Sequence, residues 1–397
     1  MRVNFLIKMS AVKRTIESSI KYYAKKYPVL AVTGPRQSGK TTMLKTMFPK
    51  YTYISLENPD LREFATTDPN GFFKYYSGNL ILDEIQQTPA LFSYIQTLVD
   101  ASGKMGQFIL SGSQNFHLMQ HITQSLAGRV ALFKLLPFDF EELQQANLLP
   151  DNYEEILVKG SYPAIFDRAL SSKVFYANYL QTFVEKDLKQ LIDVRDLRQF
   201  RNFISLCAAR SGQLVNLNSL GNECGISQPT AKAWLSVLES SYIVFLLQPY
   251  HVNFNKRIVK TPKLYFYDTG LLCHLLKITN PQSIQLHPLK GSLFENLIVA
   301  EAFKQNDHKY LHADFCFWRD ASGNEVDLLV EHNDKLSIAE IKASSTIKNE
   351  HFKGLNYFGA LEGSNVKSKN LIYTGALNQK RSQLNVVSWR ETGAILK

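Results

Sequence analysis

A phosphate-binding loop is the feature of this sequence with the most definite chemistry. Residues 29–33 form an apolar run that predicts a buried strand, and residues 42–45 read as helix. Between them lies the segment Gly34-Pro35-Arg36-Gln37-Ser38-Gly39-Lys40-Thr41. A strand, a glycine loop and a helix in this order bring backbone N–H groups to the phosphates of a nucleotide. Lys40 would reach the β and γ phosphates and the Thr41 hydroxyl would bind Mg²⁺, with Thr42 completing the predicted site.

Two adjacent carboxylates supply the second half of this site. The apolar residues 80–82 predict another buried strand, which ends in Asp83 and Glu84. Asp83 would hold the magnesium through water, and Glu84 would polarise the water that attacks the γ-phosphate. An acidic pair at this place favours ATP hydrolysis over a GTP switch, which usually lacks the second carboxylate. The sequence therefore predicts ATP and Mg²⁺ as ligands.

Two further residues could take part in the hydrolysis. A third predicted strand, 108–110, ends in the polar run Ser111-Gly112-Ser113-Gln114-Asn115. Ser113, or alternatively Gln114, would orient the attacking water, although an ordinary strand-to-loop turn explains the same residues equally well. Arg129 would stabilise charge on the γ-phosphate, acting from its own chain or from a neighbouring one. A surface ion pair is the competing interpretation of Arg129.

The motifs of this region resemble those of a known family. They are Gly-Pro-Arg-Gln-x-Gly-Lys-Thr-Thr, Leu-Asp-Glu-Ile-Gln, Leu-Ser-Gly-Ser, Ala-Gly-Arg-Val and Leu-Leu-Pro-Phe-Asp-Phe-Glu-Glu-Leu. They look like those of the AAA-type ATPases of bacteria and archaea that carry a C-terminal domain of unknown function, and the resemblance covers nearly the full length. It implies a three-layer α/β nucleotide domain with a parallel sheet. It also implies functional roles for Lys40, Thr41, Asp83, Glu84 and Arg129, but it supplies no substrate.

The middle of the chain reads as two smaller parts. Residues 149–212 are predicted helical, because apolar residues recur three and four apart, and the resemblance implies a helical lid here. In residues 213–286, two predicted helices are separated by Gly225 and are followed by two predicted strands, 242–247 and 263–267. Helix, turn, helix and hairpin is an order typical of a winged-helix domain.

Nucleic acid is a predicted partner of two basic regions. The second predicted helix offers Gln228, Thr230 and Lys232, and the hairpin region carries residues that could clamp phosphates, namely His251, Lys256, Arg257, Lys260 and Lys263. The first fifty residues hold eleven Lys or Arg and one acidic residue, so they could attract nucleic acid or a nucleotide's phosphates. A packing module and a solvated helix face explain these regions about as well.

The C-terminal part carries a second set of chemically suggestive residues. A predicted helix over 291–299 contains Glu295, and predicted strands follow at 316–319, 325–330 and 336–342. Alternation places Glu340 and Lys342 on one face of the last strand, where Asp327 would meet them. The three carboxylates would bind Mg²⁺, and Lys342 would orient or deprotonate the attacking water. The set resembles the Asp…Glu-x-Lys motif of the restriction-endonuclease-like fold; cross-strand ion pairs are the alternative.

The expected fold class is α/β, in four parts. These are a P-loop ATPase domain with a parallel sheet (1–148), the helical lid (149–212), a winged-helix-like domain (213–286) and an α/β nuclease-like domain (287–397). No apolar stretch approaches the roughly 20 residues that span a bilayer, and the first residues do not form a secretory signal. The four cysteines are scattered, so we expect neither a zinc site nor a disulfide, and a cytoplasmic location.

Two functions fit these expectations. The first is an ATPase that moves or senses nucleic acid, with a nuclease-like partner domain. The second is a regulatory nucleotide switch that binds a partner through an inactive nuclease-like domain. An arginine acting from a neighbouring chain would require a homo-oligomer, whereas Arg129 acting within one chain would not.

Overall fold

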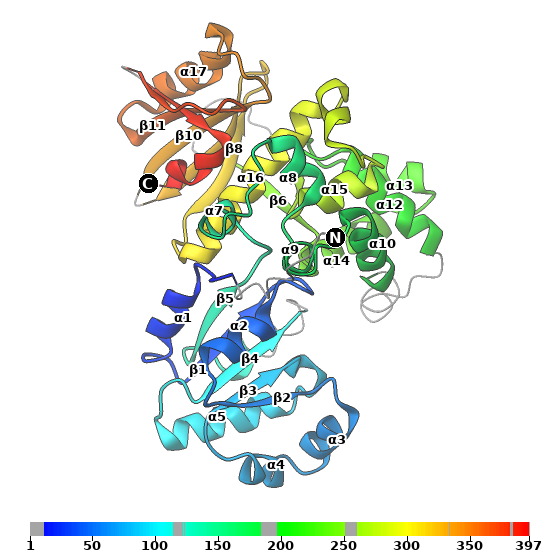
Figure 1. Cartoon of the computed structure of the whole chain (residues 1–397), viewed down its shortest axis with the longest axis vertical. Coiled ribbons are helices and arrows are strands. Elements are labelled where there is room, and N and C mark those ends of the chain that lie inside the picture. The colour runs from blue at the N-terminus through cyan, green and yellow to red at the C-terminus, as the bar shows by residue number, and fades with distance from the viewer. Residues whose placement is uncertain are drawn as a thin grey trace, which may run out of the picture. The chain divides into compact units, whose positions relative to one another are not determined.

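A computed structural model gives the structure of the chain (Figure 1) and describes residues 12–113, 122, 124–183, 197–250, 260–332, 334–381 and 384–396. The chain divides into two compact units. The first comprises Met1–Leu148, Tyr162–Ala169 and Asp307–Tyr310, and the second comprises Leu149–Ser161, Leu170–Asn306 and Leu311–Lys397. The boundaries of the four-part division expected from the sequence stay predictions.

The first unit is built on a parallel sheet of five strands in the order β2-β3-β4-β1-β5. Its strands are β1 (Val29–Thr33), β2 (Thr52–Ser55), β3 (Leu80–Asp83), β4 (Phe108–Gly112) and β5 (Val130–Lys134). Its helices are α1 (Glu17–Tyr23), α2 (Lys40–Met47), α3 (Pro59–Thr67), α4 (Pro69–Tyr75), η1 (Ile85–Gln87), α5 (Leu91–Ser102), α7 (Phe140–Gln145) and α9 (Pro163–Asp167).

Both faces of this sheet are covered. Val29 and Ala31 of β1 pack into one apolar core with residues of α3, α4 and α5, whereas Leu30 and Val32 pack into another with residues of α1 and α2. A strand buried on both faces explains why residues 29–33 are an unbroken apolar run rather than an alternating one. The three-layer α/β arrangement with a parallel sheet is confirmed.

The second unit contains an eight-stranded mixed sheet in the order β12-β13-β11-β10-β9-β8-β6-β7. Its strands are β6 (Val244–Pro249), β7 (Lys263–Phe266), β8 (Asp314–Arg319), β9 (Glu325–His332), β10 (Lys335–Lys342), β11 (Val366–Tyr373), β12 (Gln379–Lys380) and β13 (Asn385–Ser388). Its α-helices are α8 (Tyr153–Lys159), α10 (Ser172–Thr182), α12 (Leu197–Ala209), α13 (Leu217–Cys224), α14 (Gln228–Ser240), α15 (Thr269–Leu275), α16 (Lys290–Lys309, whose last residues belong to the first unit) and α17 (Lys353–Glu362). Its short helices are η3 (Pro281–Leu286), η4 (Asn349–Phe352), η5 (Gly363–Asn365) and η6 (Trp389–Leu396).

The expected hairpin and the expected meander belong to one sheet. Strands β6 and β7 pair antiparallel, as predicted, and β8, β9 and β10 form the predicted antiparallel meander. The sequence did not reveal that β6 also pairs with β8, through Gln248 and Pro249, which makes the hairpin an extension of the C-terminal sheet. None of the helices that the structure describes is both long and apolar enough to cross a bilayer.

Candidate functional site

The glycine loop and its carboxylates meet at one edge of the first unit's sheet. Because the strands are parallel, the carboxyl ends of β1, β3 and β4 lie side by side: Thr33 pairs with Gly112, and Asp83 pairs with Ser111. This edge is where parallel sheets place ligand-binding residues. Gly34 requires glycine, since its φ is 145° and a Cβ would lie 2.1 Å from the Leu135 carbonyl oxygen.

Lys40 begins helix α2 and is nearly enclosed, with 6% of its surface exposed. Its ammonium group donates to the carbonyl oxygens of Gly34 and Pro35, each at 2.8 Å. Burial lowers the pKa of Lys40 to about 8, although the charges of Glu84 and Asp83 act in the opposite direction and Arg36 adds to the lowering. Among the described residues, the hydrogen-bond partners of this buried cation are carbonyl oxygens, so it is suited to bind an anionic group brought to the loop.

Asp83 is held between three hydroxyl groups. Its Oδ2 accepts hydrogen bonds from Thr41 Oγ1 at 2.9 Å and from Tyr53 OH at 2.7 Å, and its Oδ1 accepts one from Ser111 Oγ at 2.5 Å. The structure thus brings Thr41 and Asp83 together as the sequence predicts. A hydroxyl and a carboxylate beside a phosphate loop are hard oxygen donors of the kind that Mg²⁺ prefers, so the residues present fit this metal.

Glu84 follows Asp83 in a backbone conformation that is unusual for a residue with a side chain, with φ of 54°. Its Oε2 accepts hydrogen bonds from Gln86 Nε2 and, at 3.2 Å, from Ser113 Oγ. Residues held in the left-handed region cluster at functional sites, where surrounding contacts fix them. Ser113 is thus hydrogen-bonded to Glu84, and its water-orienting role stays a prediction. The alternative, Gln114, falls outside the described residues.

Tyr53 and Ser111 were not singled out from the sequence. Tyr53 lies on β2, and only the pairing of Ser55 with Asp83 shows that this strand is a neighbour of the site. Burial and its hydrogen bond to Asp83 raise the pKa of Tyr53 far enough that it stays a proton donor. Ser111 belongs to the polar run that was noted at the end of β4, and an expectation of parallel pairing would have identified it.

Arg129 lies at the wrong end of the sheet to act on a nucleotide bound by its own chain. Its carbonyl oxygen accepts a hydrogen bond from Val29 N, at the amino end of β1, whereas the loop follows the carboxyl end of that strand. At about 3.3 Å per residue, the five residues of β1 separate the two places. The guanidinium instead binds Asp100, with Nε 2.6 Å from Oδ1 and Nη2 2.9 Å from Oδ2. The expected role within one chain is therefore corrected, and action on a neighbouring chain stays a prediction.

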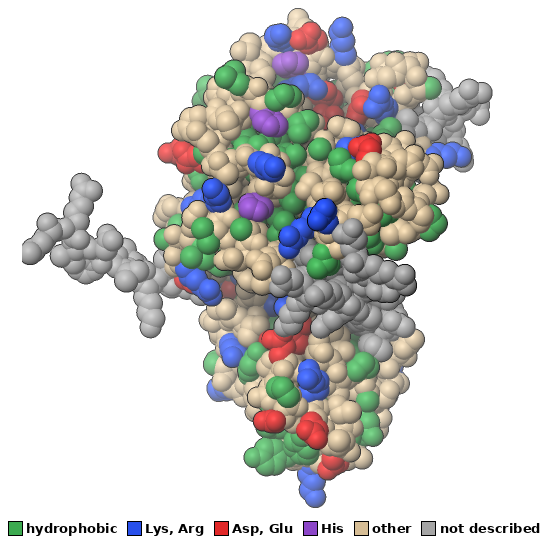
Figure 2. Space-filling view, turned by 90° about the vertical axis from the view of Figure 1, so that its right-hand side faces the viewer, with side chains coloured by type: hydrophobic (Ala, Val, Ile, Leu, Met, Phe, Trp, Pro, Cys, Tyr) green, Lys and Arg blue, Asp and Glu red, His purple; other side chains and the backbone are tan. Residues whose placement is uncertain are grey.

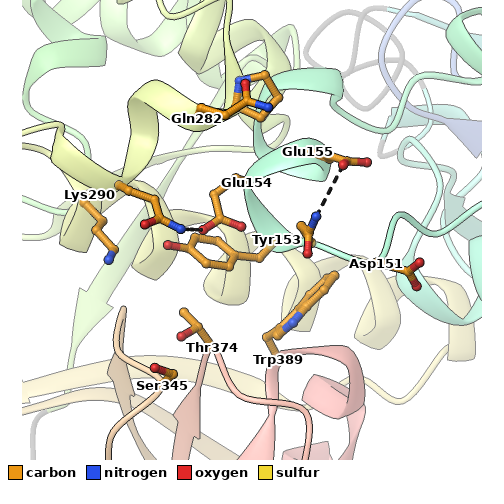
Figure 3. Close-up of a pocket in the computed structure, with 12 residues that line it drawn as sticks. Asp151, Tyr153, Glu154, Glu155, Gln282, Lys290, Ser345, Thr374 and Trp389 are labelled. Atoms are coloured by element: carbon orange, nitrogen blue, oxygen red, sulfur yellow. Dashed lines mark hydrogen bonds between the residues drawn. The ribbon is translucent and has the colours of Figure 1, made fainter.

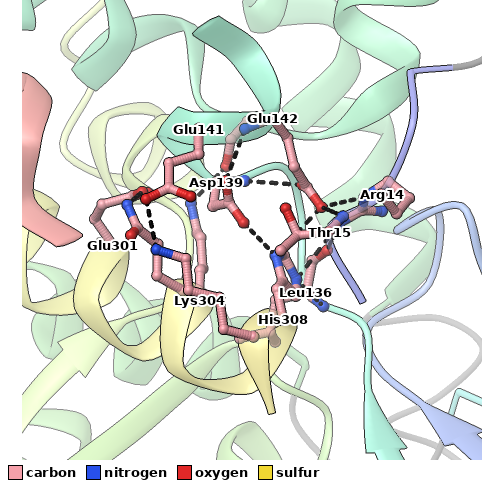
Figure 4. Close-up of polar contacts among 12 residues, drawn as sticks. Arg14, Thr15, Leu136, Asp139, Glu141, Glu142, Glu301, Lys304 and His308 are labelled. Carbon is pink, nitrogen blue, oxygen red and sulfur yellow. Dashed lines mark hydrogen bonds and ion pairs between the residues drawn. The ribbon is translucent and has the colours of Figure 1, made fainter. Parts of the chain in front are cut away.

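A buried ionic network (Figure 4) contacts the glycine loop through the Ser38 carbonyl oxygen. Arg14, which is 4% exposed, donates to the Ser38 carbonyl oxygen at 2.9 Å, to the Leu136 carbonyl oxygen at 2.7 Å and to Glu142 Oε1 at 3.0 Å. Glu142 also forms a capping box with Asp139 at the start of α7. Nothing in the sequence pattern linked Arg14 to the loop, because its partners lie 24 to 128 residues away.

His308 completes this network, and its hydrogen bonds fix its tautomer. Leu136 N donates to Nε2 at 3.2 Å, so Nδ1 carries the proton and lies 2.7 Å from Asp139 Oδ2. Burial acts to raise the pKa of Asp139, but His308, the Glu142 backbone N–H and the charge of Arg14 together hold this pKa below its ordinary value. The ligand-type atoms of Asp139, Glu142 and His308 lie within 4.8 Å of one another. They already serve Arg14 and backbone donors, so we assign them no metal.

The four residues predicted from the nuclease motif do converge in the second unit. Ala339 pairs with Leu328, so the register places Glu340 opposite Asp327, and the Asp327 carboxylate accepts a hydrogen bond from Ile341 N at 2.8 Å. Lys342 Nζ lies 2.5 Å from Glu340 Oε1. Burial and the charge of Asp327 raise the pKa of Glu340 to about 8, against the effect of Lys342. The charge of Asp327 also acts on Glu295, on α16.

Lys263 lies among these carboxylates and corrects a sequence expectation. Its ammonium is 2.9 Å from Glu295 Oε1 and 2.5 Å from Glu325 Oε1, and its side chain is only 5% exposed. It therefore does not clamp phosphates at the surface, as the hairpin pattern suggested. Lys260 and Lys232 are exposed, and His251, Lys256 and Arg257 lie outside the described residues.

A hollow of about 420 Å³ in the second unit matches no motif (Figure 3). It lies between α8, η3 and the C-terminal strands, and Tyr153, Lys290, Thr374 and Trp389 are among its lining residues. Its acidic groups are partly engaged: Glu154 accepts a hydrogen bond from Gln285 at 3.2 Å, and Asn152 donates to Glu155 at 3.3 Å. We assign it no ligand.

Three family models match successive parts of the chain. Residues 26–144 match an AAA domain, residues 150–282 match a domain of unknown function (DUF8612), and residues 290–392 match a second domain of unknown function (DUF4143). The AAA match covers the loop, Asp83 and Glu84. Neither of the other two descriptions names an activity.

Two curated relatives and one solved structure are also similar to this chain. The uncharacterized protein Rv2008c of Mycobacterium tuberculosis and the uncharacterized protein Mb2031c of Mycobacterium bovis are each 30% identical over 325 residues, which is 80% of this chain and 71% of the relative. The Walker-type ATPase PABY2304 of Pyrococcus abyssi is 15% identical, with a TM-score of 0.44 over 66% of this chain and 94% of that chain.

Proposed function

The chain belongs to the same family as the uncharacterized mycobacterial proteins Rv2008c and Mb2031c, and we propose that it binds and hydrolyses ATP with Mg²⁺. One observation supports the proposal most strongly: Lys40 and Thr41 from one segment and Asp83 and Glu84 from another meet at one edge of the sheet. This constellation has the parts that phosphoryl transfer to water requires.

Each residue would have a separate task. Backbone N–H groups of the loop and the Lys40 ammonium would bind the β and γ phosphates, and the ammonium would exchange its carbonyl partners for phosphate oxygens. Thr41 and Asp83 would hold Mg²⁺, which neutralises phosphate charge when bound. Glu84 would accept the proton of the attacking water while Ser113, hydrogen-bonded to it, fixes its orientation.

The lowered pKa of Lys40 predicts that nucleotide binding weakens at alkaline pH. Free protein would lose the Lys40 proton above pH of about 8, whereas phosphate oxygens would keep the lysine charged in the complex. Binding then takes up a proton, and ATP affinity is expected to fall by up to about tenfold per pH unit above 8. Calorimetric titrations at pH 7 and pH 9 would measure this. Equal affinities at both pH values would contradict a lowered Lys40 pKa.

Arg129 is proposed to act on a nucleotide held by a neighbouring chain. Because 35% of its side chain is accessible, the Arg129 guanidinium could exchange Asp100 for a phosphate of the neighbouring chain's nucleotide in an oligomer. We expect Arg129→Ala to slow ATP turnover only under conditions where the protein assembles, and to leave ATP binding unchanged. The check is turnover against protein concentration, with light scattering for the assembly state. A concentration-independent rate that is the same in both proteins would remove Arg129 from the mechanism.

Nucleic acid is the proposed partner of the second unit, through α14. Gln228 and Lys232 are exposed on this helix, whereas Trp234 packs against Phe200 and Phe203 in the interior. On the face drawn in Figure 2, the described Lys and Arg side chains are interspersed with acidic and uncharged ones rather than joined in one patch. With Lys232 as its exposed cation, a contact through α14 would neutralise few phosphates, so its salt dependence would be shallow, with a slope of about −0.9 per neutralised phosphate.

The alternative function, a regulatory nucleotide switch, gains support from Lys263. A cleaving site would need a divalent cation at Glu295, Asp327 and Glu340, and an ammonium group already lies at Glu295. Filter binding and cleavage assays on single- and double-stranded DNA and RNA, with and without ATP and Mg²⁺, separate the candidates. Cleavage that disappears in Lys342→Ala while ATP turnover persists would establish the nuclease. Binding without cleavage under every condition would favour the switch.

A further inference from the structure

The carboxylates of the second unit have a cation of their own. Strand β7 places Lys263 so that its ammonium contacts Glu295 on α16 and Glu325 on β9, at 2.9 and 2.5 Å. The charge of Asp327 acts on the same ammonium. Of the residues that the nuclease motif would use to bind Mg²⁺, Glu295 thus contacts a positive charge supplied by the chain itself, and the charge of Asp327 acts on it.

The oxygen of Glu295 that faces this cation has no capacity left for a metal. Oε1 accepts from Lys263 Nζ at 2.9 Å and from Tyr265 OH at 2.5 Å. A magnesium ion would have to approach to about 2.0–2.1 Å with near-octahedral geometry, beside an ammonium group that repels it. The residues present therefore do not fit a divalent cation while Lys263 is in place.

The ammonium is held there by the fold. Lys263 pairs with Leu247 across the β6–β7 ladder, and its neighbours Leu264 and Pro262 exchange backbone hydrogen bonds with residues 212–215. Its ammonium also lies 5.3 Å from the centre of the Phe317 ring. Glu340, by contrast, has one buried oxygen, Oε2, without a hydrogen-bond partner in the described part of the chain. The cluster thus has an internal cation at Glu295 and Glu325 and an acceptor oxygen without a partner at Glu340.

We propose that the Lys263 ammonium is the counter-ion of the second unit's carboxylates and occupies the place that a divalent metal would take. These carboxylates therefore bind a metal only when the ammonium is removed. The protein as it stands binds no Mg²⁺ or Mn²⁺ at Glu295, Asp327 and Glu340. Removing the ammonium leaves Glu295 and Glu325 without a shared cation, and a divalent ion can then take that place. The inference is independent of ATP hydrolysis, which uses residues of the first unit.

Manganese binding tests the proposal directly. The electron paramagnetic resonance signal of free Mn²⁺ is followed as full-length protein is added in the absence of nucleotide. Lys263→Met is expected to bind one Mn²⁺ at least about tenfold more tightly than the wild type. Adding Asp327→Asn to Lys263→Met should abolish that gain, whereas adding Glu350→Gln, an exposed acid elsewhere in the unit, should preserve it. A Lys263→Met protein that gains no manganese would overturn the proposal.

A second measurement needs no change at Lys263, in case Lys263→Met does not fold. Wild-type protein and Asp327→Asn should bind Mn²⁺ identically, because the wild-type cluster takes none. If the wild type binds one ion that Asp327→Asn loses, the ammonium does not exclude metal and the proposal fails. Lys263→Arg, which keeps the charge, should match the wild type in the same titration.

Discussion

Replacing Glu84 with glutamine is expected to slow ATP turnover by about 10²–10⁴-fold while ATP still binds. The amide cannot accept the proton of the attacking water, whereas the ammonium of Lys40 and the Thr41–Asp83 pair remain in place. Glutamine has the same shape and can still accept from Ser113 Oγ through its carbonyl oxygen. Phosphate release at saturating ATP measures the first effect, and a calorimetric titration with ATP measures the second.

The control for this change is Glu63→Gln, an exposed glutamate on α3 in the same unit. It removes the same charge from a place with no role in the site, so its turnover and ATP affinity should equal those of the wild type. Turnover near the wild-type rate in Glu84→Gln would exclude Glu84 as the base. Loss of ATP binding together with turnover would show that Glu84 supports the loop instead of acting on water.

Arg14→Met is expected to destabilise the first unit by about 3–5 kcal/mol. The reason is that Glu142, which has no exposed surface, would lose its partner guanidinium and keep a buried charge. The carbonyl oxygens of Ser38 and Leu136 would also lose donors. Hydrogen exchange of the β1 amides measures the free energy of opening of this unit separately from the second one.

Two comparisons distinguish the loss of a buried pair from the loss of an arginine. Arg129→Met breaks an exposed pair with Asp100 and should change the stability much less, because solvent screens that pair. Combining Arg14→Met with Glu142→Leu should recover part of the loss, since the carboxylate of Glu142 no longer stays buried without its guanidinium. An Arg14→Met protein as stable as Arg129→Met would contradict the importance of the network.

The first unit could be predicted in most of its parts, because its signals are local. An apolar run, a glycine loop and a helix start lie within the first fifty residues, and the strand ending in Asp83 and Glu84 was recognisable from composition alone. What brings these segments together is the parallel strand order. From that order, Ser111 and Tyr53 follow as partners of Asp83, and Arg129 follows as a residue of the opposite end.

The second unit was harder, because its site depends on pairing between distant segments. The register of β9 and β10 brought Asp327 and Glu340 together as alternation predicted. Lys263 looked like one of several surface lysines, and only the pairing of β6 with β8 shows that its hairpin belongs to the same sheet as the carboxylates. Sequence spacing alone carries no information on such a contact, since Lys263 and Glu325 are 62 residues apart.

The most direct test of a nucleotide site at the glycine loop is a calorimetric titration of wild type and Lys40→Ala with ATP in the presence of Mg²⁺. The wild type should bind one ATP per chain, and the variant should bind at least about a hundredfold more weakly, because the buried ammonium is the loop's cation for the phosphates. A wild type that binds no ATP, or two proteins with the same affinity, would contradict the proposed function.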